Sequence, residues 1–395
     1  MLDQNPPRPA PIPKQRDGRI DVLRGLALVM IFINHVPGTV FETLTNRNFG
    51  FSDAAEAFVM ISGISAALAY SGGMERGPLW PGIAKIWHRA WTLYLVHLFL
   101  SFWAIAIVFA TWRFGGSITL ALKDNFQHLL SDPYGVLIGV PTLGHQFGYV
   151  NILPMYAVLL LATPVLLMVG SRWSLRTLAA SVALWFLAGT YRLDLPAYPL
   201  PGGWFFNPLA WQLLFVTGLL TGLAMKRGAR FVPVWRPLVV LAWGFVVLAV
   251  VWLKWDTLGS FMNRNLGWAS VNGVPWLFVA FDKTYVSLPR LLHVLALAYA
   301  VSTIPGFRRF ADNPVVAPLA VMGRQALPVF AMGTLLSFVA RAVKEIALVP
   351  STGLDLALVS GGIVSMIVFA AFLDRKRAKP AAARAGRDLP VPARA

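Results

Sequence analysis

Runs of about 20 mostly apolar residues recur along this chain, and they restrict its fold more than any other feature. A helix needs about 20 such residues to cross about 30 Å of hydrocarbon, where unpaired backbone groups find no water. Ten segments meet this requirement, at approximately residues 20–40, 54–72, 84–111, 149–170, 175–191, 204–225, 237–254, 287–304, 318–340 and 355–373. The sequence therefore predicts an all-α polytopic membrane protein with about ten transmembrane helices.

The distribution of Lys and Arg predicts how these helices are oriented. The formal net charge is +17, and cytoplasmic connections carry the excess of positive residues in membrane proteins. With the N-terminus inside, only ten of the 34 Lys and Arg residues fall on the outward side. We therefore expect both termini to be cytoplasmic. The basic residues form short clusters between apolar runs instead of one stripe, so we expect no nucleic-acid partner.

The two ends of the chain differ in composition from its apolar middle. Residues 1–18 are polar and Pro-rich, without the apolar stretch of a signal peptide, and residues 376–395 are rich in Ala and Arg. We expect two disordered cytoplasmic tails flanking one transmembrane domain at residues 19–375. Two outward segments, 112–148 and 255–286, are longer than a connection requires, which is typical of functional segments or of segments ordered against the domain.

Three arginines lie at one predicted depth, and buried ionisable residues are functional hypotheses by default. Arg24, Arg89 and Arg324 each lie five or six residues into an outward-running helix, which is about 8 Å of rise. Any one of them could extend to lipid phosphates. Three in one layer favour a pocket for a polyanion, such as the phosphates of coenzyme A. Asp21 lies one turn before Arg24 and could hold it.

A histidine and two carboxylates form a second predicted layer, nearer the outside. His35 follows Arg24 by eleven residues, about 16 Å of rise on nearly the same helix face. Asp53 and Glu56 begin the next helix from the outward side, at about the depth of His35. A nearby carboxylate can fix an imidazole tautomer and raise its basicity, although His35 could also be a hydrogen-bonded packing residue.

Further residues on the outward side are candidates for contacting an acceptor. Arg290 and His293 enter one helix from that side, although a packing role is the better interpretation of His293. Most of the 15 Trp residues should form interfacial belts, but Trp211 could stack on a sugar ring. The two layers suit an acyl donor from the cytoplasm and a hydroxyl acceptor from outside. A transporter with a proton relay would show similar buried charge.

The absence of cysteine narrows the chemistry. The chain has no Cys, so disulfides, thiolate metal sites and a cysteine nucleophile are excluded. We expect no bound metal and no permanently bound cofactor.

Several motifs carry a family resemblance. In order along the chain, RGLALVMIFINH (24–35), AEAFVMISGISAAL (55–68) and WHRAWTLYLVHL (87–98) resemble the R-x10-H, second-helix and third-helix motifs of the membrane-bound acyltransferase-3-like superfamily. One such motif is weak evidence, and three at the right helices are strong. RIDVLRGLALVMIFINH, FNPLAWQLLF, DKTYVSLPRLLHVLAL and GRQALPVF are similar to the OpgC family, which succinylates osmoregulated periplasmic glucans. The resemblance covers roughly residues 18–375.

This resemblance implies a bacterial inner-membrane O-acyltransferase that uses succinyl-CoA as co-substrate and the hydroxyls of a periplasmic glucan as acceptor. His35 matches the catalytic histidine, and Ser62 of the second motif joins the donor-binding residues. The third motif departs from the superfamily pattern, because it has a single arginine, Arg89, flanked by His88. A sugar hydroxyl needs a base as it attacks the thioester carbonyl, and we assign that role to His35, oriented by Glu56 or Asp53.

Several alternatives remain open at this point. A covalent acyl-histidine could replace direct transfer. The same chemistry could use another donor or acceptor, as in acetylation of another cell-envelope polysaccharide. A transporter of an anionic solute and a purely structural or sensing membrane protein are rivals from other classes. The sequence predicts acyl-CoA, periplasmic glucan and lipid bilayer as partners, and no particular oligomeric state.

Overall fold

The computed structural model describes residues 17–75, 78–347 and 351–385, and over these residues it contains helices but no β-strand. All ten predicted segments are helical. They correspond to α1 (Gly18–Asn34), α2 (Ala54–Glu75), α3 (Leu79–Gly115), α6 (Ile152–Arg172), α7 (Ser174–Tyr191), α8 (Pro208–Lys226), α9 (Arg236–Lys254), α12 (Leu288–Ser302), the pair α14 (Ala317–Arg324) and α15 (Ala326–Ile346), and α16 (Thr352–Ala385).

Seven helices in the described part of the chain are long and apolar enough to cross a membrane. They are α2, α3, α6, α8, α9, α15 and α16. The all-α, multi-pass membrane fold predicted from the sequence is therefore confirmed, with seven such helices. The other three predicted spans are α1, α7 and α12, which are shorter or less apolar.

Two boundaries differ from the sequence prediction. The ninth predicted span is interrupted at Gln325, which separates α14 from α15 with φ −105° and ψ 33°. The last helix continues to Ala385, beyond the predicted domain boundary at residue 375, because the Ala-rich sequence favours the helix. The remaining parts of the two predicted tails, residues 1–16 and 386–395, lie outside the described residues.

The two long segments that are predicted to face outward contain helices. The shorter elements of the chain are η1 (Val40–Leu44), η2 (Asn46–Asn48), η3 (Thr119–Leu122), α4 (His128–Ser131), α5 (Pro133–Gly139), α10 (Asp256–Val271), α11 (Trp276–Val279), α13 (Phe307–Ala311) and η4 (Pro314–Val316). Elements η3, α4 and α5 lie in segment 112–148, and α10 and α11 lie in segment 255–286. Both segments therefore contain helical structure.

Local sequence explains where several helices begin. Asn207 caps α8, because its side chain accepts a hydrogen bond of 2.9 Å from the Leu209 N–H. Pro208 follows in the first turn, where a missing N–H costs nothing. At α1, the Asp17 carboxylate accepts a 3.1 Å bond from the Arg19 N–H, which is also favourable at the positive end of the helix dipole.

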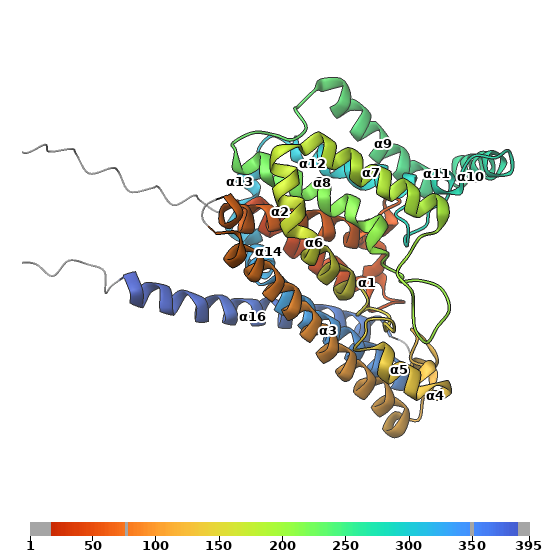
Figure 1. Cartoon of the computed structure of the whole chain (residues 1–395). Helices are drawn as coiled ribbons and strands as arrows, with labels where there is room; N and C mark the ends of the chain where they lie inside the picture. Colours follow the sequence, from red (N-terminus) through yellow and green to blue (C-terminus); the bar gives the residue numbers. More distant parts are fainter. Residues whose placement is uncertain (1–16, 76–77, 348–350, 386–395) are drawn as a thin grey trace, which may run out of the picture.

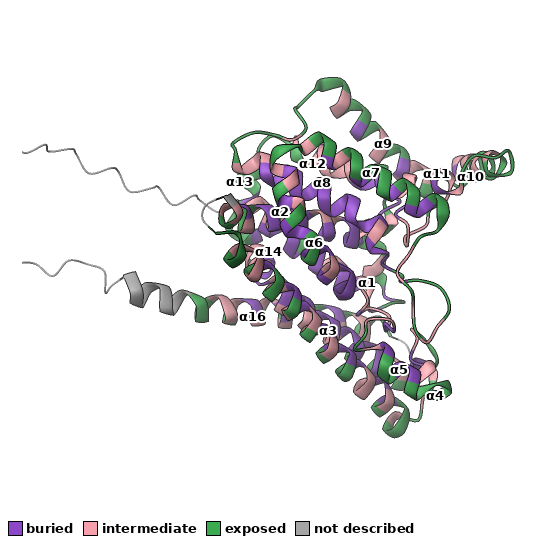
Figure 2. Ribbon diagram, viewed as in Figure 1, coloured by how far each residue is buried: buried purple, intermediate pink, exposed green. Residues whose placement is uncertain are grey.

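The centre of the bundle is a close contact between α2 and α8. A Cβ atom at Gly63 or Gly218 would lie 2.0 or 1.9 Å from a backbone carbonyl oxygen of the other helix, so only glycine permits this approach. Small residues at such contacts are typical of helix packing in membranes. The buried residues concentrate around these helices, whereas α9 and much of α16 are exposed along their length (Figure 2).

The packing of α1, α3 and α15 positions the site. Helix α1 packs against α2, α14 and α15, and α3 packs against α6 and α15. Gly25 and Gly323 allow α1 and α14 to touch, since a Cβ atom at either would lie within 2.0 Å of a carbonyl oxygen of the other helix. The start of α1 and the end of α16 lie at the same end of the bundle, on the left in Figure 1.

Candidate functional site

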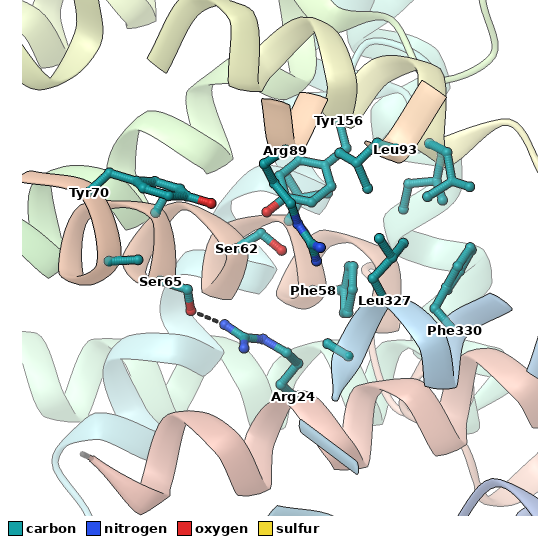
Figure 3. Close-up of a pocket in the computed structure, with 16 residues that line it drawn as sticks. Arg24, Phe58, Ser62, Ser65, Tyr70, Arg89, Leu93, Tyr156, Leu327 and Phe330 are labelled. Carbon is teal, nitrogen blue, oxygen red and sulfur yellow. Dashed lines mark hydrogen bonds between the residues drawn. The ribbon is translucent and has the colours of Figure 1, made fainter. Parts of the chain in front are cut away.

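A cavity of about 150 Å³ opens among α1, α2, α3, α6 and α15 (Figure 3). Its two ends differ in chemistry. The end that α2 lines with Tyr70 is polar, and the end that α2 lines with Phe58 is apolar. The polar side chains of the lining are Arg24, Ser62, Ser65, Tyr70, Arg89 and Tyr156, and the larger apolar ones are Phe58, Leu93, Ile152, Leu153, Leu327 and Phe330. Tyr70 and Phe58 are twelve residues apart on one helix, about 18 Å of rise, so the cavity is elongated along the helices.

Arg24 enters the cavity from α1 and is nearly fully buried. Its guanidinium donates a 3.2 Å hydrogen bond to the Gly323 carbonyl and another to the Ser65 hydroxyl. Gly323 lies at the end of α14, where carbonyl groups lack helical partners. The interruption at Gln325 thus leaves the Gly323 carbonyl available to Arg24. In a continuous helix this carbonyl would accept a hydrogen bond from a later backbone N–H.

Arg89 points into the cavity from α3, opposite Arg24 (Figure 3). Among the described residues it forms no hydrogen bond or ion pair, and its charge acts on the nearby Tyr70 hydroxyl. An arginine without a carboxylate partner in a half-enclosed cavity is a ready site for an anion, since its planar fork matches phosphate and carboxylate oxygens. The cavity therefore brings Arg24, Arg89 and Ser62 together.

Arg324 does not belong to this cavity, so the predicted layer of three arginines is wrong in this respect. Its guanidinium forms an ion pair with Asp374 of α16, with an N–O distance of 2.7 Å, on the far side of α14. Equal depth along two helices does not determine which way a side chain faces. Asp21 is buried between α1 and α14, where it acts electrostatically on Arg324, and it does not line the cavity.

His35 lies directly after α1, where its backbone N–H closes the helix on the carbonyls of Ile31 and Phe32. Its imidazole contacts the Tyr149 ring at a centroid distance of 4.4 Å and an angle of 58°. It also borders a second, much smaller cavity of about 10 Å³. Phe330 lines both this cavity and the larger one, so the two are neighbours along α15.

The two predicted carboxylates have other partners than His35. The Glu56 carboxylate accepts a 2.8 Å hydrogen bond from Arg290 Nε and a 3.0 Å bond from the Asp53 N–H. Asp53 forms an ion pair with Lys283 and caps α2 through a 2.8 Å bond from the Ala55 N–H. Within the described part of the chain, neither carboxylate is hydrogen-bonded to His35. In this structure both groups are instead paired with basic residues over 200 positions away, Arg290 and Lys283.

Most of the side chains predicted to contact an acceptor also have partners within the protein. Arg290 binds Glu56, and the His293 imidazole contacts the Ser52 hydroxyl at 2.7 Å, which fits the packing role considered for it. Trp211 is fully buried, and its indole N–H donates a 3.0 Å bond to the Lys283 carbonyl. A sugar cannot stack on a buried ring, so the assignment of Trp211 is wrong.

Sequence reasoning missed Tyr149, Arg341 and Asp124, which lie near His35. Arg341 of α15 lies 4.7 Å from the centroid of the Tyr149 ring and forms a 2.5 Å ion pair with Asp124. Tyr149 has a φ of +68°, a strained conformation for a bulky residue. Lys283, Asp53 and Arg341 all act electrostatically on the imidazole. The only sequence signal was the charge of Arg341 and Asp124, because nothing in the order of residues shows that the two meet.

The described residues contain no group of three or more His, Cys, Asp or Glu residues arranged to hold a metal ion. The fold and site together define an all-α, multi-pass membrane protein in which an arginine-lined cavity adjoins a partly buried histidine. Residues 16–378 match the protein family described as OpgC protein. The match covers almost the whole chain, and the protein belongs to this family. Comparisons with curated proteins and with solved structures found no match.

Proposed function

We propose that this protein is an O-acyltransferase of the bacterial inner membrane, which moves a succinyl group from cytoplasmic succinyl-CoA to hydroxyls of an osmoregulated periplasmic glucan. Membership of the OpgC family supports this assignment and the placement in the acyltransferase-3-like superfamily. The observation that carries it is the elongated cavity with Arg24 and Arg89 at its polar end and His35 beyond its apolar end.

The dimensions of the site fit an extended donor. Arg24 and His35 are eleven residues apart, about 16 Å along α1. A phosphate-bearing end at the arginines would leave a slender chain to run past Leu327 toward His35. The apolar end of the cavity suits the uncharged thioester better than the phosphates, because burying an unpaired charge there would be costly.

The proposed reaction is transfer of an acyl group between sulfur and oxygen. The hydroxyl oxygen of the glucan attacks the thioester carbonyl, forming the C–O bond as the C–S bond breaks. His35 accepts the proton of the hydroxyl and returns it to the departing sulfur of coenzyme A, so that protons balance over the cycle. Tyr149, packed against the imidazole and held by Arg341, restricts the orientation of the base.

The proposed orientation of the protein in the membrane follows from the distribution of Lys and Arg. Lys and Arg concentrate in the connections at the end of the bundle where α1 begins and α16 ends, and positive residues favour the cytoplasm. Both termini are then cytoplasmic, with all ten helical segments crossing or entering the bilayer. The polar end of the cavity faces inward, and His35 lies nearer the periplasm.

An assay with sealed inside-out vesicles tests the proposal. Succinyl-CoA is added to the outer solution, which contacts the cytoplasmic face, and glucan is enclosed in the lumen. We expect mass spectrometry to show succinyl increments on the enclosed glucan, with free coenzyme A released outside. Acetyl-CoA in a parallel reaction tests the alternative donor. Movement of a solute with the thioester intact would instead identify a transporter, and labelling only when both substrates share one compartment would refute transfer across the membrane.

A further inference from the structure

Phe330 occupies the boundary between the two cavities. It lies on α15, lines both the arginine cavity and the His35 cavity, and is 4% exposed. Its ring stacks against Phe58 of α2, with a centroid distance of 6.3 Å and an angle of 28°. Figure 3 shows both rings at the end of the cavity opposite Tyr70.

The space beyond Phe330 is too small for an acyl group. The His35 cavity has a volume of about 10 Å³, which is about what a single water molecule requires. Its other walls are made by helix backbone at Gly333 and by large side chains that pack in the core, including Phe32 and Met366. Phe330 lines both spaces, so displacement of its side chain would join them.

We propose that Phe330 is a gate between the donor cavity and His35, closed in this structure and displaced when the thioester end of the donor enters. This proposal rests on the proposed acyltransferase function. In the closed state the aromatic pair keeps cytoplasmic water out of the His35 cavity, since an apolar constriction excludes water. Phe330 is then a positioning residue, which admits the thioester to the base only when a donor chain fills the passage.

The gate has a chemical consequence. If water reaches the thioester beside His35, water replaces the sugar hydroxyl as nucleophile, the C–S bond breaks, and free carboxylic acid and the coenzyme A thiol are released. Phe330→Ala should therefore raise the release of coenzyme A in the absence of glucan several-fold. It should also lower the number of succinyl groups transferred per coenzyme A released when glucan is present.

A matched control separates gating from loss of packing. Phe215 of α8 is fully buried and lines neither cavity, so Phe215→Ala creates a similar void elsewhere. Phe215→Ala should reduce stability but leave the ratio of transfer to release at the native value. If Phe330→Ala has the same ratio as Phe215→Ala, the gate is refuted.

The lack of cysteine allows a second test that needs no catalysis. Thr334 lines the His35 cavity and Ser62 lines the donor cavity, so single Thr334→Cys and Ser62→Cys variants place a thiol on either side of Phe330. A small membrane-impermeant thiol reagent added to inside-out vesicles should label the thiol at position 62 readily and that at 334 slowly. Adding Phe330→Ala should speed labelling at 334 several-fold and leave labelling at 62 unchanged.

The two experiments distinguish failure of the gate from failure of the function. Equal labelling rates at 334 with and without Phe330→Ala would refute the gate, even if the native protein transfers succinyl groups. If the native protein transfers no acyl group, the proposed function is refuted. Phe330 then has no role as a gate in acyl transfer.

Discussion

Removing Arg290 should destabilise the fold through Glu56, and the size of the effect follows from burial. Glu56 is fully buried, and Arg290 is 12% exposed while it donates two hydrogen bonds to one Glu56 oxygen. Arg290→Met leaves the carboxylate in the interior with no cation in contact. Breaking a buried pair in this way costs about 3–5 kcal/mol. Glu56→Gln should cost less, about 1–3 kcal/mol, because Asp53 remains 3.7 Å from Arg290.

The double variant Glu56→Gln, Arg290→Met should recover part of this loss, since it leaves no uncompensated charge at position 56. The expected interaction energy in the cycle is therefore favourable and on the order of 2 kcal/mol. Unfolding of all four proteins in the same detergent measures it. Arg47→Met is the control, because the Arg47–Glu42 pair is 49% and 23% exposed, and its loss should cost at most about 1 kcal/mol.

Two results would refute this reasoning. The first is an Arg290→Met protein no less stable than Arg47→Met, which would show that the buried pair contributes nothing. The second is a double variant no more stable than Arg290→Met. That outcome would show that the uncompensated charge of Glu56 is not the cause of the lost stability.

Three further predictions concern catalysis, donor binding and pH. His35→Ala should lower succinyl transfer about 10²- to 10⁴-fold while the protein stays folded, and near-native glucan substitution in cells would remove His35 from the mechanism. Arg24→Ala and Arg89→Ala should each weaken acyl-CoA binding about 10- to 100-fold in calorimetry, with glucan binding unchanged and only partial rescue by Arg24→Lys; unchanged donor affinity in both alanine variants would make the arginines structural. Burial raises the pKa of Asp194, in the connection after α7, from 3.8 to about 6, so its charge opposes folding increasingly as pH rises from 4 through 6. The pKa shift implies roughly 3 kcal/mol, which solvent screening reduces to about 1 kcal/mol. Asp194→Asn should therefore stabilise the protein by about 1 kcal/mol at pH 8 and by nothing at pH 4. Equal gains in stability at the two pH values would contradict this assignment.

The helices were predictable because their signal is local. Each run of apolar residues satisfies its backbone internally, so its length and composition suffice to place it, as α3 and α6 show. The break at Gln325 was not predictable in the same way. The segment GRQALPVF contains no helix-breaking residue before Pro328. The interruption depends instead on two tertiary contacts: Arg24 binds the Gly323 carbonyl, and the Gln325 amide bonds to Asp374.

The polar residues of the larger cavity could also be inferred in part from the sequence. Depth along a helix placed Arg24 and Arg89 in one layer, and the cavity brings them together with Ser62. The same argument placed Arg324 wrongly, because the rotation of its helix about the helix axis turns the side chain toward Asp374 of α16. A helical period relates residues on one helix and carries no information on how that helix is turned toward another.

The sequence by itself determined the class of protein and the approximate positions of its helices. Only the tertiary structure decided the partners of each charge. Glu56 could have faced His35 or Arg290, 234 positions away along the chain, and the packing of α12 against α2 selects the arginine. The reason is energetic: a fully buried carboxylate is stabilised far more by a cation that donates two hydrogen bonds than by a neutral imidazole.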